Sequence, residues 1–159
     1  MVRLALSVAL LLPAMPLGAQ TARPRLDYAN AATIRDTCLH WATERKLRVA
    51  IVVLEPHGMP VTLAHMDDVS VAGGEIARWK AVSAAKFGRA TADMAALNPP
   101  AGMPNVATLA GGIPIYTADG VLLGGVGVSG GKPADDAACA TAGVEAAGLK
   151  AARPAPPAQ

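Results

Sequence analysis

His65 and Met66 are the adjacent pair of residues best suited to chemistry in this sequence. Both side chains can coordinate iron, and histidine is the commonest axial ligand of haem iron. Because adjacent residues of a strand point to opposite faces of the sheet, only one of the two can face a given ligand. We therefore take His65 as the candidate iron ligand and keep Met66 as a candidate contact. The alternative is a surface histidine beside a core methionine.

The two other histidines occupy less suitable positions. His57 falls in an expected turn, Glu55-Pro56-His57-Gly58, where a solvated ring is the simpler interpretation. His40 falls on an expected helix, away from its apolar stripe. The sequence contains no Cys-x-x-Cys-His motif, which excludes covalent haem attachment of the c type.

Two basic residues near the end of an expected helix are candidate ligand contacts. Lys80 and Arg89 could neutralise the acidic groups of a bound molecule. Alternatively, they solvate the carboxyl end of the helix, where the helix dipole favours positive charge.

Four glycines form a third set of candidates. Backbone N–H groups exposed at glycines can hold a carboxylate or a phosphate. The alternative is that a helix crosses the sheet so closely that no side chain fits. Both interpretations stay open for Gly111, Gly112, Gly125 and Gly127.

The elements that would position these residues alternate between helices and hairpins. Apolar periodicity and turn signals predict helices over 28–46, 75–87, 92–97 and 133–147, and strands over 47–54, 61–66, 113–118 and 121–128. Thr91 is the expected cap of the short helix 92–97. Hairpins imply antiparallel pairing, so the predicted class is α+β rather than doubly wound α/β. We expect a single antiparallel sheet of four to five strands flanked by helices.

The N-terminus has the features of a cleavable secretory signal. Arg3 precedes the apolar run 4–12, and Ala19 is a small residue at the expected cleavage site. The run is too short to cross a bilayer, so we expect no membrane insertion after cleavage. The predicted division is a signal peptide at 1–19, one domain at 20–149 and a disordered tail at 150–159. The expected location is the periplasm or the exterior of the cell.

Charge and cysteine content limit the possible functions further. The net charge of +2 becomes +1 once Arg3 is removed, which gives no basis for nucleic-acid binding. Cys38 and Cys139, the only cysteines, fall on the apolar faces of the first and last predicted helices. An oxidising compartment would allow them to form a disulfide, although free buried cysteines are also common.

The chain resembles the GlcG/HbpS-like haem-binding (haem-degrading) domain family over about Asp27 to Leu149. The resemblance rests on four stretches, which are 49–53 through Gly58 to 65–67, 80–91, 111–115, and 124–130 with Asp135, Asp136, Cys139 and Ala140 after it. The chain departs from the family pattern in three places. Leu54-Glu55 replaces the common Val-Asp, His65 replaces a common Arg, and Asp68 replaces a common Gly.

The resemblance implies haem as the cofactor or ligand, and frequent homo-oligomers. The leading hypothesis is an exported protein that binds or sequesters haem, with possible slow haem degradation. An accessory binder or enzyme for a small organic acid is the second hypothesis, and a non-catalytic structural or interaction module is the third. Because members of one fold family differ in chemistry, enzymatic activity stays open.

Overall fold

The computed structural model describes residues 22–155, so the predicted signal peptide lies outside the described residues. The elements are α1 (Tyr28–Glu44), β1 (Ala50–Leu54), β2 (Pro60–His65), α2 (Val71–Phe87), α3 (Thr91–Ala96), β3 (Gly112–Tyr116), β4 (Leu122–Ser129) and α4 (Pro133–Ala146). The order of helices and hairpins is the predicted one, and the α+β class is confirmed.

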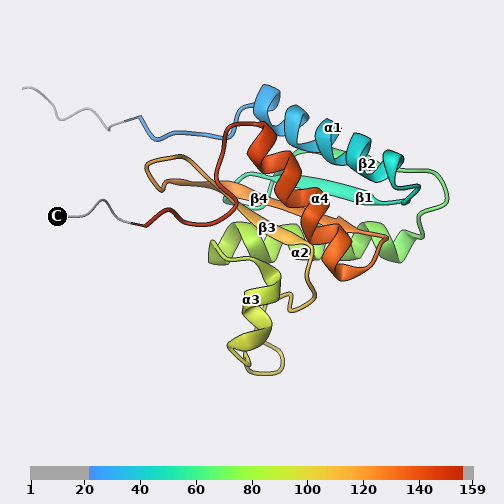
Figure 1. The fold of residues 1–159 in the computed structure, drawn as a ribbon. Helices are drawn as coiled ribbons and strands as arrows, with labels where there is room; N and C mark the ends of the chain where they lie inside the picture. The colour runs from blue at the N-terminus through green and yellow to red at the C-terminus, as the bar shows by residue number, and fades with distance from the viewer. Residues whose placement is uncertain (1–21, 156–159) are drawn as a thin grey trace, which may run out of the picture.

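The strands form one four-stranded sheet in the order β2-β1-β4-β3. All three neighbouring pairs are antiparallel. The two hairpins, β1–β2 and β3–β4, meet through the central pair β1–β4 (Figure 1). Both hairpin turns therefore lie at the same end of the sheet.

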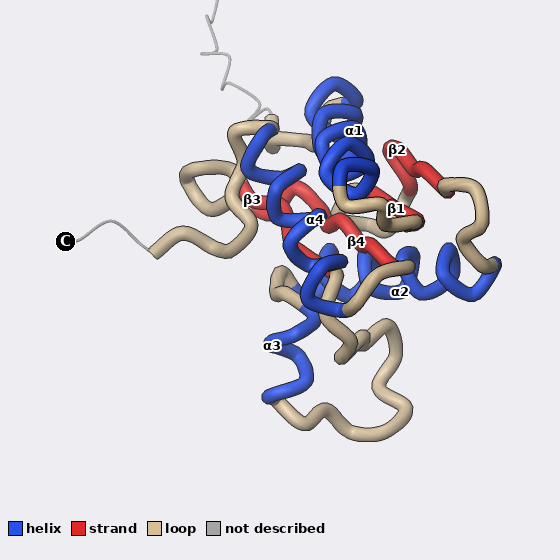
Figure 2. Tube along the Cα trace, turned by 45° about the vertical axis from the view of Figure 1, so that its right-hand side comes forward, coloured by secondary structure: helices blue, strands red, loops and turns tan. Residues whose placement is uncertain are grey.

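Helices cover both faces of this sheet (Figure 1). The helices α1 and α4 contact each other and pack on one face, whereas α2 packs on the other across β4, β1 and β3. Figure 2 shows α3 and the long loop after it on the far side of α2 from the sheet. Within residues 22–155, no helix is long and apolar enough to cross a membrane.

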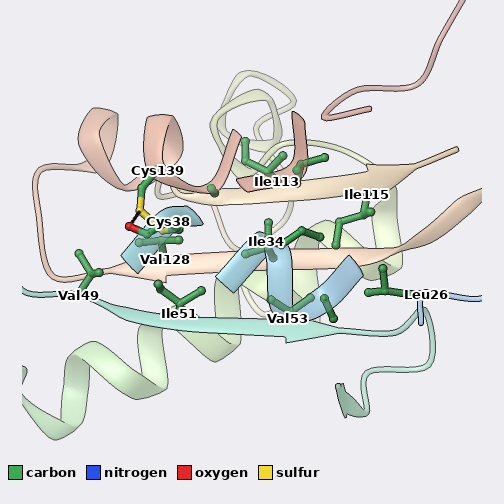
Figure 3. Packing of buried hydrophobic residues seen from close by; sticks show 14 of the residues in the cluster. Leu26, Ile34, Cys38, Val49, Ile51, Val53, Ile113, Ile115, Val128 and Cys139 are labelled. Carbon is green, nitrogen blue, oxygen red and sulfur yellow. Dashed lines mark hydrogen bonds between the residues drawn. A yellow bond between two sulfur atoms is a disulfide. The ribbon is translucent and has the colours of Figure 1, made fainter. Parts of the chain in front are cut away.

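The main core lies between the sheet and the α1–α4 layer (Figure 3). Alternate residues of β1, such as Ile51 and Val53, face it and are fully buried. The structure joins Cys38 of α1 to Cys139 of α4 in a disulfide, with the two Cα atoms 4.8 Å apart. A covalent bond thus links the first and last helices at the edge of this core.

The helix starts differ from the predictions for local reasons. Helix α2 begins at Val71, four residues before the predicted start at Glu75, because the Ser70 side chain accepts a hydrogen bond from Gly73 N at 3.1 Å and caps the first turn. Thr91, the expected cap of α3, is instead its first residue. Its hydroxyl accepts from Gly112 N at 2.9 Å and donates to the Leu109 carbonyl at 2.7 Å.

The C-terminal segment stays on the domain beyond Leu149. Lys150 exchanges two backbone hydrogen bonds with Tyr116, each 2.9 Å long. Arg153 lies over the Tyr116 ring, with its Cζ 5.5 Å from the ring centre. This corrects the predicted start of the disordered tail at residue 150, because pairing with the edge strand β3 was not visible in a sequence rich in alanine and proline.

Candidate functional site

A pocket of about 1300 Å³ lies at the end of the sheet where both hairpins turn. Its walls come from the N-terminal segment 22–26, from the β1–β2 turn and from the start of β4. The apolar lining consists of Ala22, Pro24, Leu26, Pro56, Pro60, Val61, Val121 and Leu122. Charged or titratable side chains at the pocket are Arg23, Arg25, Glu55 and His57. Apolar walls with a few polar groups are typical of small-molecule sites.

The β1–β2 turn places His57 at this pocket. Glu55 N donates to the Met59 carbonyl at 3.0 Å, and Gly58 N donates to the Glu55 carbonyl at 2.9 Å. Gly58 takes a φ of +93°, which glycine adopts without the steric cost that a Cβ would bring. The sequence Glu55-Pro56-His57-Gly58 therefore forms a tight turn that presents the imidazole outward, with 87% of the side chain exposed.

A carboxylate orients the His57 ring. Glu55 Oε2 lies 2.7 Å from His57 Nδ1, and Glu55 Oε1 accepts a hydrogen bond from Met59 N at 3.0 Å. Burial acts to raise the Glu55 pKa, but the hydrogen bonds from Met59 N–H and from His57 outweigh it, so the pKa lies below its ordinary value. With Glu55 ionised, Nδ1 of the neutral ring is the donor and Nε2 is free to act as a ligand.

His65 lies elsewhere on the molecule. It ends β2 opposite Ala50, on the α2 side of the sheet, and it lines neither of the two pockets described here. Its ring lies against Gly74 of α2, where an added Cβ would be 3.1 Å from Cδ2. The ring is exposed and accessible to a ligand, but it lies outside both pockets.

Met66 is turned toward the interior. Its Sδ accepts a hydrogen bond from Val49 N at 3.5 Å, and the side chain packs against the main core. The two members of the His65–Met66 pair thus have different environments, because His65 is exposed and Met66 packs against the core.

Lys80 is not available to a ligand, which corrects its proposed role. The side chain is fully buried, and its Nζ donates to the Val128 carbonyl at 2.8 Å and to Asp136 Oδ2 at 2.9 Å. A hydrogen-bonded ion pair satisfies a charge that would be very costly to bury alone. The sequence placed Lys80 on a helix end near Arg89, whereas the structure places it in the middle of α2, above β4.

The four glycines lie where a helix approaches the sheet, which favours the packing alternative over anion binding. A Cβ on Gly125 or Gly127 would collide with the α2 backbone between Ala77 and Ala85. A Cβ on Gly112 would collide with the Lys80 carbonyl, and one on Gly111 would lie 2.6 Å from Lys80 Nζ. All four glycines are buried. Their backbone is covered by α2 or by the Lys80 side chain rather than open to a ligand.

Arg89 is the predicted contact that the structure does place at a pocket. It follows the C-cap Gly88 of α2, is exposed, and lines a second pocket of about 440 Å³ with Arg153. The structure therefore separates the predicted residues into a sheet edge with His65, a buried structural group with Lys80 and the glycines, and a pocket with Arg89.

The residues of the larger pocket were largely missed by sequence reasoning. The spacing Glu55-x-His57 before a turn glycine is a signal that could have marked His57 as oriented by a carboxylate. Arg23 and Arg25 carry no comparable signal. They reach the pocket because segment 22–26 folds back on the hairpins, and that contact is purely tertiary.

Comparisons with known proteins agree with this fold. Residues 26–145 match the model of a family described as "Haem degrading protein HbpS-like". A PduOC:haem complex superimposes with a TM-score of 0.75 at 23% identity, covering 82% of this chain and 100% of that one. HbpS superimposes at 0.74 with 26% identity, covering 83% and 96%. A double mutant of HbpS from Streptomyces reticuli gives 0.74 at 25% identity, covering 86% and 97%. No curated protein matches the chain significantly.

Proposed function

The chain belongs to the HbpS-like haem degrading protein family, and from this premise we propose that it binds haem. The observation that carries the proposal is the pairing of His57 with Glu55 at the mouth of the 1300 Å³ pocket. Histidines that bind metals almost always present their other ring nitrogen to a carboxylate, a carbonyl or water. His57 therefore replaces His65 as the preferred iron ligand.

The residues around the pocket fit the chemical groups of haem. The apolar side chains of Leu26, Val61 and Leu122 would contact the macrocycle. Arg23 and Arg25 carry the positive charge that propionates require. When bound, haem supplies a redox-active iron whose properties depend on its axial ligand and on the hydrogen bonds of that ligand. In this chain, Glu55 would orient the ligand nitrogen of His57, and the apolar walls of the pocket would exclude water from one side of the haem.

Haemin titration of the disulfide-bonded protein, followed by Soret absorbance, tests this site. We expect saturation at one haem per chain. His57→Ala removes the ligand and abolishes the specific Soret shift, and Glu55→Gln weakens binding by about 10–100-fold, the usual cost of losing a partner of a metal ligand. His40→Ala is the matched control. His40 is also exposed and lies 3.3 Å from a carboxylate, that of Glu44, but on α1 away from the pocket.

Three results would argue against the site or the function. Equal binding by wild type and His57→Ala, with loss in His65→Ala, would move the site to the β2 edge. Absorbance changes without saturation in the wild type would overturn haem binding altogether. Loss of binding in His40→Ala, which lies away from the pocket, would show that the effect of His57→Ala is not specific to this site.

Degradation of bound haem is the finer part of the proposal, and it rests on the family description. Its test is the loss of Soret absorbance under ascorbate and oxygen in the presence of catalase, which removes free peroxide. If the full Soret band persists for as long as free haemin takes to bleach, the protein binds haem without degrading it.

Export to the periplasm or the cell exterior is also proposed. The disulfide Cys38–Cys139 supports it, because disulfides persist in oxidising compartments and are rare in the cytosol. N-terminal sequencing of protein recovered from the periplasmic fraction should begin near Gln20. Recovery of the chain only from the cytoplasm, starting at Met1, would contradict export.

We further propose that the chain forms a homo-oligomer. The support is the exposed apolar surface on the β1–β2 hairpin and the start of α2, where Met59 is 66%, Leu63 59% and Val71 82% exposed. Large apolar side chains that are this exposed on a small domain are candidates for an interaction surface. Light scattering after gel filtration should give a multiple of the chain mass, and Leu63→Glu should reduce it to one.

A further inference from the structure

The second pocket, of about 440 Å³, is built by parts of the chain that are far apart in sequence. The end of α2 and the turn after it contribute Phe87 and Arg89, β3 contributes Pro114 and Tyr116, and the C-terminal segment contributes Ala151 and Arg153. The volume is within the range of small-molecule sites. It is separate from the pocket with His57, since the two share no lining residue.

The C-terminal segment is held in place as one wall of this pocket. Lys150 pairs with the backbone of Tyr116, and the Arg153 guanidinium lies over the Tyr116 ring. The Tyr116 hydroxyl donates to the Gly88 carbonyl at 2.8 Å, which fixes the ring against the end of α2. Tyr116 therefore positions both Arg153 and the turn that carries Arg89.

The charges of this pocket are unbalanced. Arg89 and Arg153 are both at its surface, and Asp93 is the single acidic residue that lines it. Among residues 22–155, neither arginine forms a salt bridge, whether to Asp93 or to any other carboxylate. The pocket thus holds a net charge of about one positive unit, with guanidinium donors that are free for a ligand.

We propose that this pocket binds a small organic monocarboxylate. The planar guanidinium matches a carboxylate in a two-point hydrogen-bonded contact. Phe87, Pro114 and Ala151 offer apolar surface for the body of the ligand. One net positive charge matches a monoanion better than a dianion, because Asp93 would repel the second negative group. The inference does not depend on haem binding.

Calorimetric titration and thermal shift with benzoate and hexanoate test the proposal, with benzamide and hexanamide as uncharged counterparts. We expect the acids to bind and the amides not to bind. Arg89→Gln or Arg153→Gln should each weaken benzoate binding about tenfold, since a charge-assisted hydrogen bond is lost. Asp93→Asn should strengthen it, because the repulsion is removed. Arg78→Gln, an exposed arginine of α2 that lines neither pocket described here, is the control.

The outcomes separate this site from the haem site. Haemin titration of Arg89→Gln and Arg153→Gln should match wild type, so the two proposals fail independently. No saturation by either acid up to about 10 mM would overturn the monocarboxylate site. Equal affinity for acid and amide, or unchanged affinity in both arginine variants, would do the same.

Discussion

Lys80 and Asp136 form a buried ion pair, with Nζ 2.9 Å from Oδ2, that connects helices on opposite faces of the sheet. The Lys80 ammonium also donates to the Val128 carbonyl at 2.8 Å, and Asp136 Oδ1 accepts from Gly131 N at 2.9 Å. Gly111 makes room for the contact, because a Cβ there would meet Nζ. One hydrogen-bonded group thus joins α2, the end of β4 and the first turn of α4.

Removing one partner of this ion pair should destabilise the domain strongly. Lys80→Met leaves the Asp136 carboxylate buried without a counter-charge, and we expect a loss of about 3–5 kcal/mol in the free energy of unfolding. Urea denaturation measures it. Lys86→Met, on the exposed side of the same helix, should change stability by no more than about 0.5 kcal/mol.

A second substitution sharpens this prediction. Adding Asp136→Leu to Lys80→Met removes the uncompensated charge and should recover a large part of the lost stability. If the double variant is as unstable as Lys80→Met alone, the effect is one of packing rather than of charge. If Lys80→Met and Lys86→Met unfold alike, the ion pair contributes nothing measurable.

The disulfide should supply a large share of the stability of this small domain. Cys38 and Cys139 are 101 residues apart, and the chain-entropy model allows a gain of about 4–5 kcal/mol for a loop of that length. The double variant Cys38→Ala, Cys139→Ala should therefore unfold at a lower urea concentration than the oxidised wild type.

Reduction by dithiothreitol separates the effect of the disulfide bond from the effect of the two alanine substitutions. The reduced wild type should unfold close to the double alanine variant, and the variant itself should not respond to the reductant. A wild type whose unfolding midpoint is the same with and without reductant, after thiol titration has shown full reduction, would contradict the prediction.

The close approach of α2 to β4 predicts that a side chain added to a β4 glycine destabilises the domain. Gly127→Ala places a Cβ against the Ala77 carbonyl and the Ala81 backbone, and neither can move without displacing the helix. Overpacking of this kind costs about 1–3 kcal/mol. Gly74→Ala is the matched control, because its nearest obstacle is the exposed His65 ring and alanine favours the helix by about 0.5–1 kcal/mol. Equal unfolding midpoints for the two variants would contradict the close approach.

The fold could be predicted from sequence because its signals are local. The turn at Asp119-Gly120, the N-cap Asp27 and the C-cap Gly88 mark element ends directly, and the structure has all three at such positions. The uniformly apolar sequence of β1 could not show which face each residue occupies, since all five of its residues are buried. Small residues in β4 likewise indicated a close contact without identifying the partner helix.

The candidate sites were harder to predict because they depend on tertiary contacts. Lys80 had the appearance of a solvated helix residue, and its burial follows from Asp136, which is 56 residues away. Arg153 was assigned to a disordered tail, yet the pairing of Lys150 with Tyr116 holds it at a pocket. In each case the deciding partner lies in another element, which periodicity and turn signals do not report.

The lowered pKa of Glu55 makes the stability of the β1–β2 turn depend on pH. Because the folded pKa lies below the ordinary value near 4.5, the unfolded chain binds more protons in acid, and the contribution of Glu55 is complete above that value and lost as the pH falls through the folded pKa. Glu55→Gln should be less stable than wild type at pH 7, and the difference should shrink below about pH 4.5. Urea unfolding from pH 7 to 3 measures this, with Glu145→Gln on α4 to account for the loss of an exposed carboxylate. A difference that stays constant, or grows in acid, would show that the hydrogen bonds from Met59 and His57 do not favour the ionised carboxylate.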